Sequence, residues 1–181
     1  MSQTIHRLLR GVDRLSDATA ALAVGLMAVM IGATLYEIVA RYVFNAPTIW
    51  SNDVSTMLNG SVFLLAAGHT LRNDGHVRID VVWQMLPARA RHGVQAVFLL
   101  GVFAPVLGLG TYYAIVKAWR AWERGSVETA SAWEPLIWPF LTALAVGLLG
   151  LLIQVVAEGV RNGLRLAGIA DPPDPTRPSA S

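Results

Sequence analysis

Side chains that could do chemistry are few in this chain, and their positions argue against most kinds of reaction centre. The four histidines are His6, His69, His76 and His92, and only His69 lies inside an uncharged apolar stretch. A haem held between membrane helices by two histidines needs both at membrane depth. Zero cysteines exclude disulfides, thiolate chemistry and cysteine-based metal sites. We therefore expect no metal, no cofactor and no enzymatic activity.

A transport site within this chain would need polar ligands near the middle of the membrane, often beside broken helices or a repeated half. No acid lies inside the apolar stretches, and no inverted duplication is apparent. Asn59 and Ser61 are a strongly polar pair well inside one stretch. Such residues could bind a solute, but they more commonly make hydrogen bonds between helices. His69, near the end of the same stretch, is expected to be a satisfied interface histidine rather than a proton relay.

The elements that position these residues are four stretches without Asp, Glu, Lys or Arg: 18–36, 54–71, 93–116 and 136–157. About 20 residues at 1.5 Å each cross a hydrocarbon core of ~30 Å, so all four predict transmembrane helices. Stretch 54–71 is the shortest of the four, and polar residues interrupt it. The alternative to a transmembrane helix here is a re-entrant or tilted segment. Composition agrees, because only 14% of residues are charged, against about 25% in soluble domains.

The sequence thus predicts an all-α polytopic membrane protein, with one domain over 1–170 and a disordered tail over 171–181, rich in Pro and Ser. The amino-terminal segment, the loop around 72–92 and the carboxy-terminal end together carry ten basic residues, against four on the opposite face. The positive-inside rule then makes both termini cytoplasmic. Because the basic residues flank the apolar stretches, the pI near 9.4 indicates headgroup contact rather than nucleic-acid binding. With 19 uncharged residues, the first stretch is longer than a signal-peptide core.

Three other segments have predicted structure. Apolar residues recur at helical spacing over 3–17 and again over 79–86, which predicts short amphipathic helices at the membrane surface that anchor to lipid or dock on another helix. Residues 117–134 look like a helical extension of the third stretch, broken at Gly125.

Pairs of glycines predict close helix contacts. Gly25 and Gly32 are seven residues apart, as are Gly101 and Gly108, and seven residues return to nearly the same helix face. The neighbour is either a helix of this chain or another subunit. The GxxxG match that begins at Gly159 lies beyond the fourth stretch, and we expect it to contribute little.

Two segments between the apolar stretches are more specific. In the first, Glu37 and Arg41 form an i, i+4 pair where the first helix leaves lipid. Pro47 then turns the chain, and Trp50 anchors it again before Asp53 opens the next helix near its positive dipole end. These are features of a well-formed loop.

The second segment is the run Arg-Asn-Asp-Gly-His-Val-Arg-Ile-Asp, which begins at Arg72. Its Asn-Asp-Gly portion predicts a tight turn after the second apolar stretch. Arg78 and Asp80 are then available for short-range ion pairs.

The order and positions of these segments resemble the small permease subunit of TRAP transporters, the tripartite ATP-independent periplasmic systems, of the DctQ type. The resemblance covers nearly the whole chain, through four spans, an Arg-Tyr-x-Phe-Asn-x-Pro stretch followed by a tryptophan, and an Arg-x-x-Gly-His-x-Arg-x-Asp stretch after the second span. After the tryptophan the family usually carries a Glu-rich stretch, where this chain has Ser-Asn-Asp. The matching residues, expected at a subunit interface, are Arg41, Phe44, Pro47, Trp50, Asp53, Arg72, Gly75, His76, Arg78 and Asp80.

The resemblance implies an accessory role in a bacterial inner membrane. In TRAP systems a periplasmic binding protein delivers an organic acid, commonly a carboxylate, to a large membrane subunit that moves it inward with sodium. The small subunit binds the large permease subunit and braces it. The resemblance places the first segment on the periplasmic side near the subunit seam, and gives the second the task of shaping a cytoplasmic loop for the partner.

Two other functions compete with this one. The first is a self-sufficient four-helix carrier or exporter that works as a homo-oligomer, which a buried acid in mid-span would have favoured. The second is a membrane-bound redox subunit, which would show a Soret band.

Overall fold

The computed structural model describes residues 2–72 and 88–166, with side chains for 11–71, 93–164 and 166. Its helices are α1 (Ser2–Tyr42), α2 (Ser51–Arg72), α4 (Ala88–Phe98), a π-helical turn (Leu99–Phe103), α5 (Ala104–Arg124) and α6 (Trp138–Leu166). Within these ranges, Val127 and Leu136 form one isolated antiparallel bridge and no longer strand occurs. The all-α prediction is confirmed for the described part of the chain.

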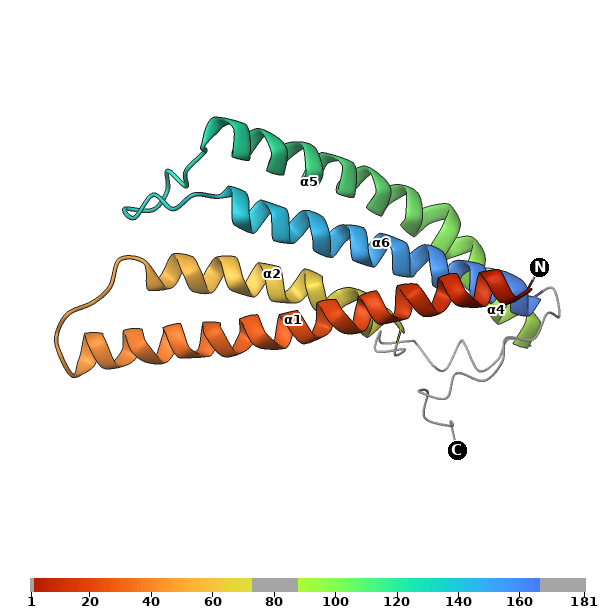
Figure 1. Cartoon of the computed structure of the whole chain (residues 1–181), viewed down its shortest axis with the longest axis horizontal. Helices are drawn as coiled ribbons and strands as arrows, with labels where there is room; N and C mark the ends of the chain where they lie inside the picture. The colour runs from red at the N-terminus through yellow and green to blue at the C-terminus, as the bar shows by residue number, and fades with distance from the viewer. Residues whose placement is uncertain (1, 73–87, 167–181) are drawn as a thin grey trace.

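The four longest helices of the described residues form two helical hairpins. α1 and α2 form one hairpin, α5 and α6 form the other, and the four helices lie across the molecule in the order α5, α6, α2, α1 (Figure 1). α2 packs against both α1 and α6, so it is the central connection between the hairpins. We call the end that carries loops 43–50 and 125–137 the hairpin end. The start of α1 and the end of α6 lie together at the opposite end.

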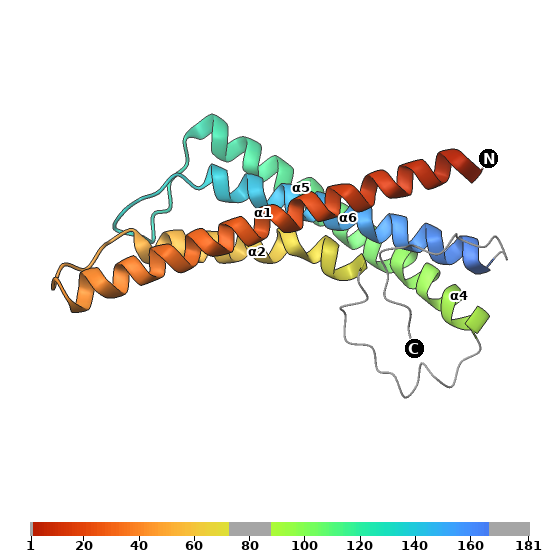
Figure 2. The ribbon, with the colours of Figure 1, turned by 60° about the horizontal axis from the view of Figure 1, so that its bottom comes forward.

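α1 also makes a direct contact with α6. Figure 2 shows α1 crossing α6 obliquely near the opposite end of the molecule. Residues 3–17 therefore do not form a separate surface helix, because α1 continues without a break from Ser2 to Tyr42. Asp13 and Ser16, within this stretch, hydrogen-bond to α6, so this part of the helix docks on another helix of the same chain. The second predicted surface helix, over 79–86, lies outside the described residues.

Three of the described helices are long and apolar enough to cross a membrane by length and composition: Gly11–Tyr42, Gly93–Arg124 and Trp138–Leu164. They contain the first and third predicted spans and all but the first two residues of the fourth. The predicted second span falls in α2, which is a helix of 22 residues but is less apolar than the other three. Because α2 lies between α1 and α6, less of its surface is exposed, and packing against protein tolerates more polar residues than lipid does.

The helical extension predicted over 117–134 reaches only to the break expected at Gly125, and residues 126–134 are not helical. α5 ends at Arg124, and Gly125 follows in the left-handed conformation with φ +56°, which glycine adopts without steric cost. Between α4 and α5 the chain takes a π-helical turn. Pro105 follows that turn and has no N–H to donate to the carbonyl of Gly101. The loss of this backbone hydrogen bond distorts a regular helix.

The close helix contacts involve different glycines from those expected. A Cβ added to Gly147 of α6 would lie 2.8 Å from the Cβ of Leu64 in α2, and one added to Gly159 would lie 2.6 Å from Cγ of Leu100. Of the GxxxG match that was expected to contribute little, Gly159 therefore makes a close contact, whereas a Cβ at Gly163 would meet nothing within 4 Å. A Cβ at Gly25, Gly32, Gly101 or Gly108 would meet nothing within 4 Å, so no described helix of this chain is their close neighbour.

Candidate functional site

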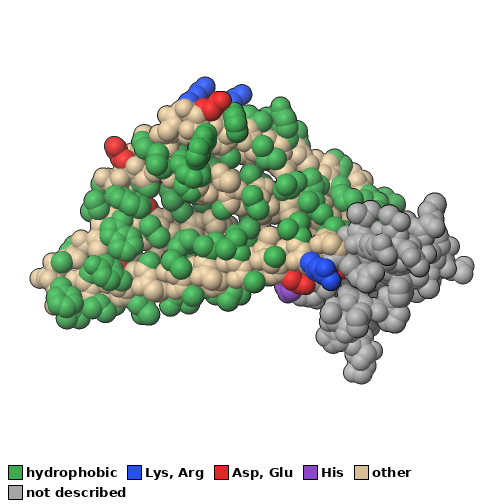
Figure 3. Space-filling view, viewed as in Figure 1, with side chains coloured by type: hydrophobic (Ala, Val, Ile, Leu, Met, Phe, Trp, Pro, Cys, Tyr) green, Lys and Arg blue, Asp and Glu red, His purple; other side chains and the backbone are tan. Residues whose placement is uncertain are grey.

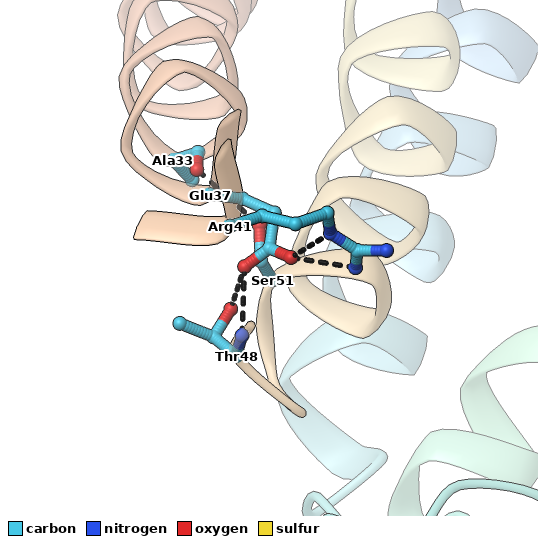
Figure 4. Close-up of polar contacts among 5 residues, drawn as sticks. All are labelled: Ala33, Glu37, Arg41, Thr48 and Ser51. Atoms are coloured by element: carbon cyan, nitrogen blue, oxygen red, sulfur yellow. Dashed lines mark hydrogen bonds and ion pairs between the residues drawn. The ribbon is translucent and has the colours of Figure 1, made fainter. Parts of the chain in front are cut away.

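The first motif segment is organised around the carboxylate of Glu37, one turn before the end of α1 (Figure 4). Arg41 donates to Glu37 Oε1 from Nε at 2.9 Å and from Nη2 at 2.6 Å. The backbone N–H of Thr48 donates to Glu37 Oε2 at 3.0 Å, and the Thr48 hydroxyl donates to the same oxygen. The predicted Glu37–Arg41 pair is confirmed, and the carboxylate also holds the loop that follows it.

Two further contacts fasten the start of α2 to α1. The Trp50 ring stacks on Tyr36, with centroids 5.8 Å apart and planes at 26°. The hydroxyl of Ser51, which is buried, donates to the backbone carbonyl of Ala33 at 3.2 Å. Asn45 makes the turn between them with φ +53°, a left-handed conformation that asparagine tolerates. Arg41 and Trp50 thus hold the 43–50 loop against its own helix.

Other motif residues at this end point outward. Phe44 is 71% exposed, Pro47 is exposed, and Tyr42, Val43 and Ile49 beside them are exposed as well. Hydrophobic side chains are visible along this end of the molecule (Figure 3). Exposed aromatic and aliphatic side chains at a helix end are typical of a membrane interface or of a protein contact.

Asp53 connects the two hairpins. It lies in the first turn of α2, as expected, and its Oδ2 accepts a hydrogen bond from the hydroxyl of Ser131 in the 125–137 loop. The Ser131 hydroxyl also accepts the backbone N–H of Trp133 at 3.1 Å. Asp53 and Ser131 are 78 positions apart in the sequence, so local residue spacing could not predict this contact.

The second motif segment cannot be compared with its predicted role. Arg72 is the last residue of α2, and its side chain lies outside what the structure describes. Gly75, His76, Arg78 and Asp80 also lie outside the described residues.

A buried polar cluster at the opposite end was missed by the sequence analysis. Arg161 of α6 donates from Nη2 to Asp13 Oδ2 of α1 at 2.7 Å and from Nη1 to Glu158 Oε2 at 3.2 Å. The side chains of Arg161, Asp13 and Glu158 are only 6%, 13% and 8% exposed. Ser16 donates to Oε1 of the fully buried Gln154 at 3.0 Å. Buried charges need such partners, because an isolated ion is strongly destabilised away from water.

The sequence contained a signal for this cluster. Gln154, Glu158 and Arg161 are spaced i, i+4 and i+7, which puts them on one face of a helix. The predicted fourth span stopped at residue 157, whereas α6 continues to Leu166. A polar stripe on a helical continuation of an apolar span indicates contact with another polar helix face.

His69 lies near this cluster in a satisfied environment, as expected. Its Nδ1 is 3.1 Å from Oδ1 of Asp17, so the pair links α1 to α2. The expected interhelical hydrogen bonds of Asn59 and Ser61 are absent from the described residues. Ser61 donates to the carbonyl of Met57 in its own helix at 2.8 Å, and Asn59 is exposed.

An apolar groove of about 370 Å³ lies between α5 and α6 near the hairpin end. Trp119, Trp122 and Trp138 contribute to its wall, and the last two rings meet edge to face with centroids 4.4 Å apart. Tryptophan prefers the membrane–water interface. Among the described residues no group of three or more acids or histidines could hold a metal ion.

Comparison with known proteins identifies the family of the chain. Residues 30–165 match the family described as tripartite ATP-independent periplasmic transporters, DctQ component. Seventy-two residues, 40% of the chain, are 31% identical to the sialic acid TRAP transporter permease protein SiaT of Haemophilus influenzae (strain 86-028NP). The match covers 12% of that longer protein. No solved structure matches the chain. With three quarters of its length matched, the chain belongs to the DctQ family of TRAP transporters, which makes it a multi-pass component of a membrane transport system and not a member of an enzyme family.

Proposed function

We propose that this chain is the small membrane subunit of a TRAP transporter in a bacterial inner membrane, where it binds and braces the large permease subunit. That subunit takes an organic acid, commonly a carboxylate, from a periplasmic binding protein and moves it inward with sodium. The relative SiaT is named for sialic acid and is much longer than the matched region. Both points support the proposal that this chain works beside a large permease that moves an acidic solute.

One structural observation carries the bracing role. The ionisable side chains buried between α1 and α6 are paired with one another, since Arg161 bonds both Asp13 and Glu158. A coupling site must instead exchange its ligand with solvent during each cycle. Paired and buried charges that join two hairpins are suited to hold a fixed shape, which is what a supporting subunit requires.

The topology in this proposal has four crossings, with both termini in the cytoplasm. The start of α1 and the end of α6 lie at the same end of the molecule (Figure 1), as an even number of crossings requires. From Asp17 to Glu37 there are 20 residues, or about 30 Å of helix, which equals the hydrocarbon thickness. α2 runs beside this part of α1, and in the proposal it crosses as the second span.

The motif residues then have roles at the two membrane surfaces. Arg41, Trp50 and Asp53 shape the periplasmic loops near the seam with the large subunit, and the exposed Phe44 and Pro47 contact it directly. On the cytoplasmic side, Arg72, Gly75, His76, Arg78 and Asp80 shape the loop for the partner.

The test is affinity purification of the tagged chain from native membranes in mild detergent, followed by mass spectrometry. We expect one large, multi-span membrane protein in near-stoichiometric amount. A chain that purifies alone as a stable homo-oligomer and moves a solute in liposomes would instead establish the self-sufficient carrier.

A further inference from the structure

α2 carries a stripe of four polar residues and one phenylalanine on the face that it does not bury in this subunit. Asn52, Thr56, Asn59, Phe63 and Thr70 are all exposed, and Phe63 is 74% exposed. Their spacing of four, three, four and seven residues places them on one side of a helix. The buried side of α2 carries Ser61, Val62 and Leu65 instead.

Asn59 is the residue of this stripe that most needs a partner. It lies six residues from Asp53 and ten from His69, or about 9 Å and 15 Å along the helix, so it is well inside the membrane. The hydroxyls of Thr56 and Thr70 donate to the carbonyls of Asn52 and Ala66 in their own helix, at 2.9 and 3.1 Å. The amide of Asn59 makes no hydrogen bond to any residue that the structure describes.

Lipid cannot supply what this side chain lacks. Acyl chains offer neither donors nor acceptors, and an amide without a hydrogen bond is costly in hydrocarbon. A second membrane helix can supply both, and Asn is among the side chains that join helices in this way. Phe63, one turn further along the stripe, adds a large apolar contact for the same neighbour.

We infer that the exposed face of α2 defined by Asn52, Thr56, Asn59, Phe63 and Thr70 is where a transmembrane helix of the large permease subunit docks, with a hydrogen bond to the Asn59 amide. This inference rests on the proposed function. It also accounts for the polar residues on the exposed side of α2, because in the complex they meet protein and not lipid.

The absence of cysteine from the chain allows a direct test by site-specific crosslinking. Asn59→Cys, carrying a thiol-attached benzophenone, is irradiated in native membranes that contain the large permease. The matched control is Val106→Cys, whose position is 66% exposed and lies in α5, which α6 separates from α2 (Figure 1). We expect an adduct between this chain and the large permease from position 59 and little or none from position 106. Adducts from position 59 only with a second copy of this chain or with lipid would overturn the inference.

A second measurement compares Asn59→Leu with Ser61→Ala, two residues away and buried, in co-purification with the large permease. We expect Asn59→Leu to weaken association by about 3- to 18-fold, from the average to the largest effect of single interhelical hydrogen bonds in membranes, and Ser61→Ala to leave it unchanged. No weakening by Asn59→Leu, or equal weakening by both variants, would overturn the inference. If the unaltered chain retains the permease while position 59 forms no adduct, only this inference fails. If the unaltered chain retains no permease, the proposed function fails with it.

Discussion

The two hairpins approach each other closely at Gly147, and replacing this glycine by alanine tests the packing directly. The new Cβ would lie 2.8 Å from the Cβ of Leu64, 2.9 Å from its backbone carbon and 3.1 Å from its carbonyl oxygen. Backbone atoms cannot rotate away as a flexible side chain can. α2 and α6 must therefore separate by about 0.6 Å to reach an ordinary contact of 3.4 Å, and gaps of 0.5–1 Å forfeit about a quarter to a half of each dispersion contact that they open.

A matched control separates this effect from helix propensity. Gly150 is in the same helix, three residues further on, and a Cβ there meets nothing within 4 Å. Both substitutions gain the same intrinsic preference of alanine over glycine, about 1 kcal/mol. Overpacking typically costs about 1–3 kcal/mol, so Gly147→Ala should be less stable than Gly150→Ala by that amount.

The assay is thermal unfolding of each purified variant in the same detergent, followed by tryptophan fluorescence. For a chain of this size, 1 kcal/mol corresponds to about 2–4 °C in Tm, so we expect Gly147→Ala to melt roughly 2–12 °C below Gly150→Ala. Equal melting temperatures would refute the close contact between α2 and α6.

Two other predictions concern polar contacts between elements. Arg161→Met leaves the buried carboxylates of Asp13 and Glu158 without their shared cation and should lower the free energy of unfolding by about 3–5 kcal/mol, measured by the same melting assay. The triple variant with Asp13→Leu and Glu158→Met removes all three charges and should recover most of this loss, and a triple variant as unstable as the single one would contradict the ion-pair explanation. Ser131→Ala removes the hydrogen bond to the Asp53 carboxylate, a type worth about 1.5–3 kcal/mol, and should speed amide hydrogen exchange in the 125–137 loop. Unchanged exchange there would show that this bond does not hold the loop.

Much of the chain's local structure could be predicted from spacing alone. The uncharged stretches locate the helices, because about 20 apolar residues have few other stable arrangements. The Glu37–Arg41 pair followed from the i, i+4 geometry of a helix, and the end of α5 from the conformational freedom of Gly125. Each of these features depends on residues within a turn or two of each other.

Contacts between distant residues could not be predicted in the same way. The Asp13–Arg161 pair joins residues 148 positions apart, and it required α1 to continue as one helix through a stretch that its pattern assigned to the membrane surface. The glycines also had the expected spacing, but spacing cannot show which side of a helix faces a neighbour. Gly147 and Gly159 make close contacts, while Gly25 and Gly108 do not.

The sequence by itself determined that the chain is helical, that it belongs in a membrane, and which short motifs relate it to TRAP transporters. These properties depend on composition and on spacing along single helices. Only the tertiary structure decided how each helix is rotated about its axis and which helix it meets. That rotation buries Gln154 and Arg161 inside the subunit and leaves Asn59 exposed on the surface of α2. The rotation of each helix depends on the packing of all helices together. No local sequence pattern could therefore distinguish the polar residues that hold this subunit together from Asn59, which we infer meets the partner.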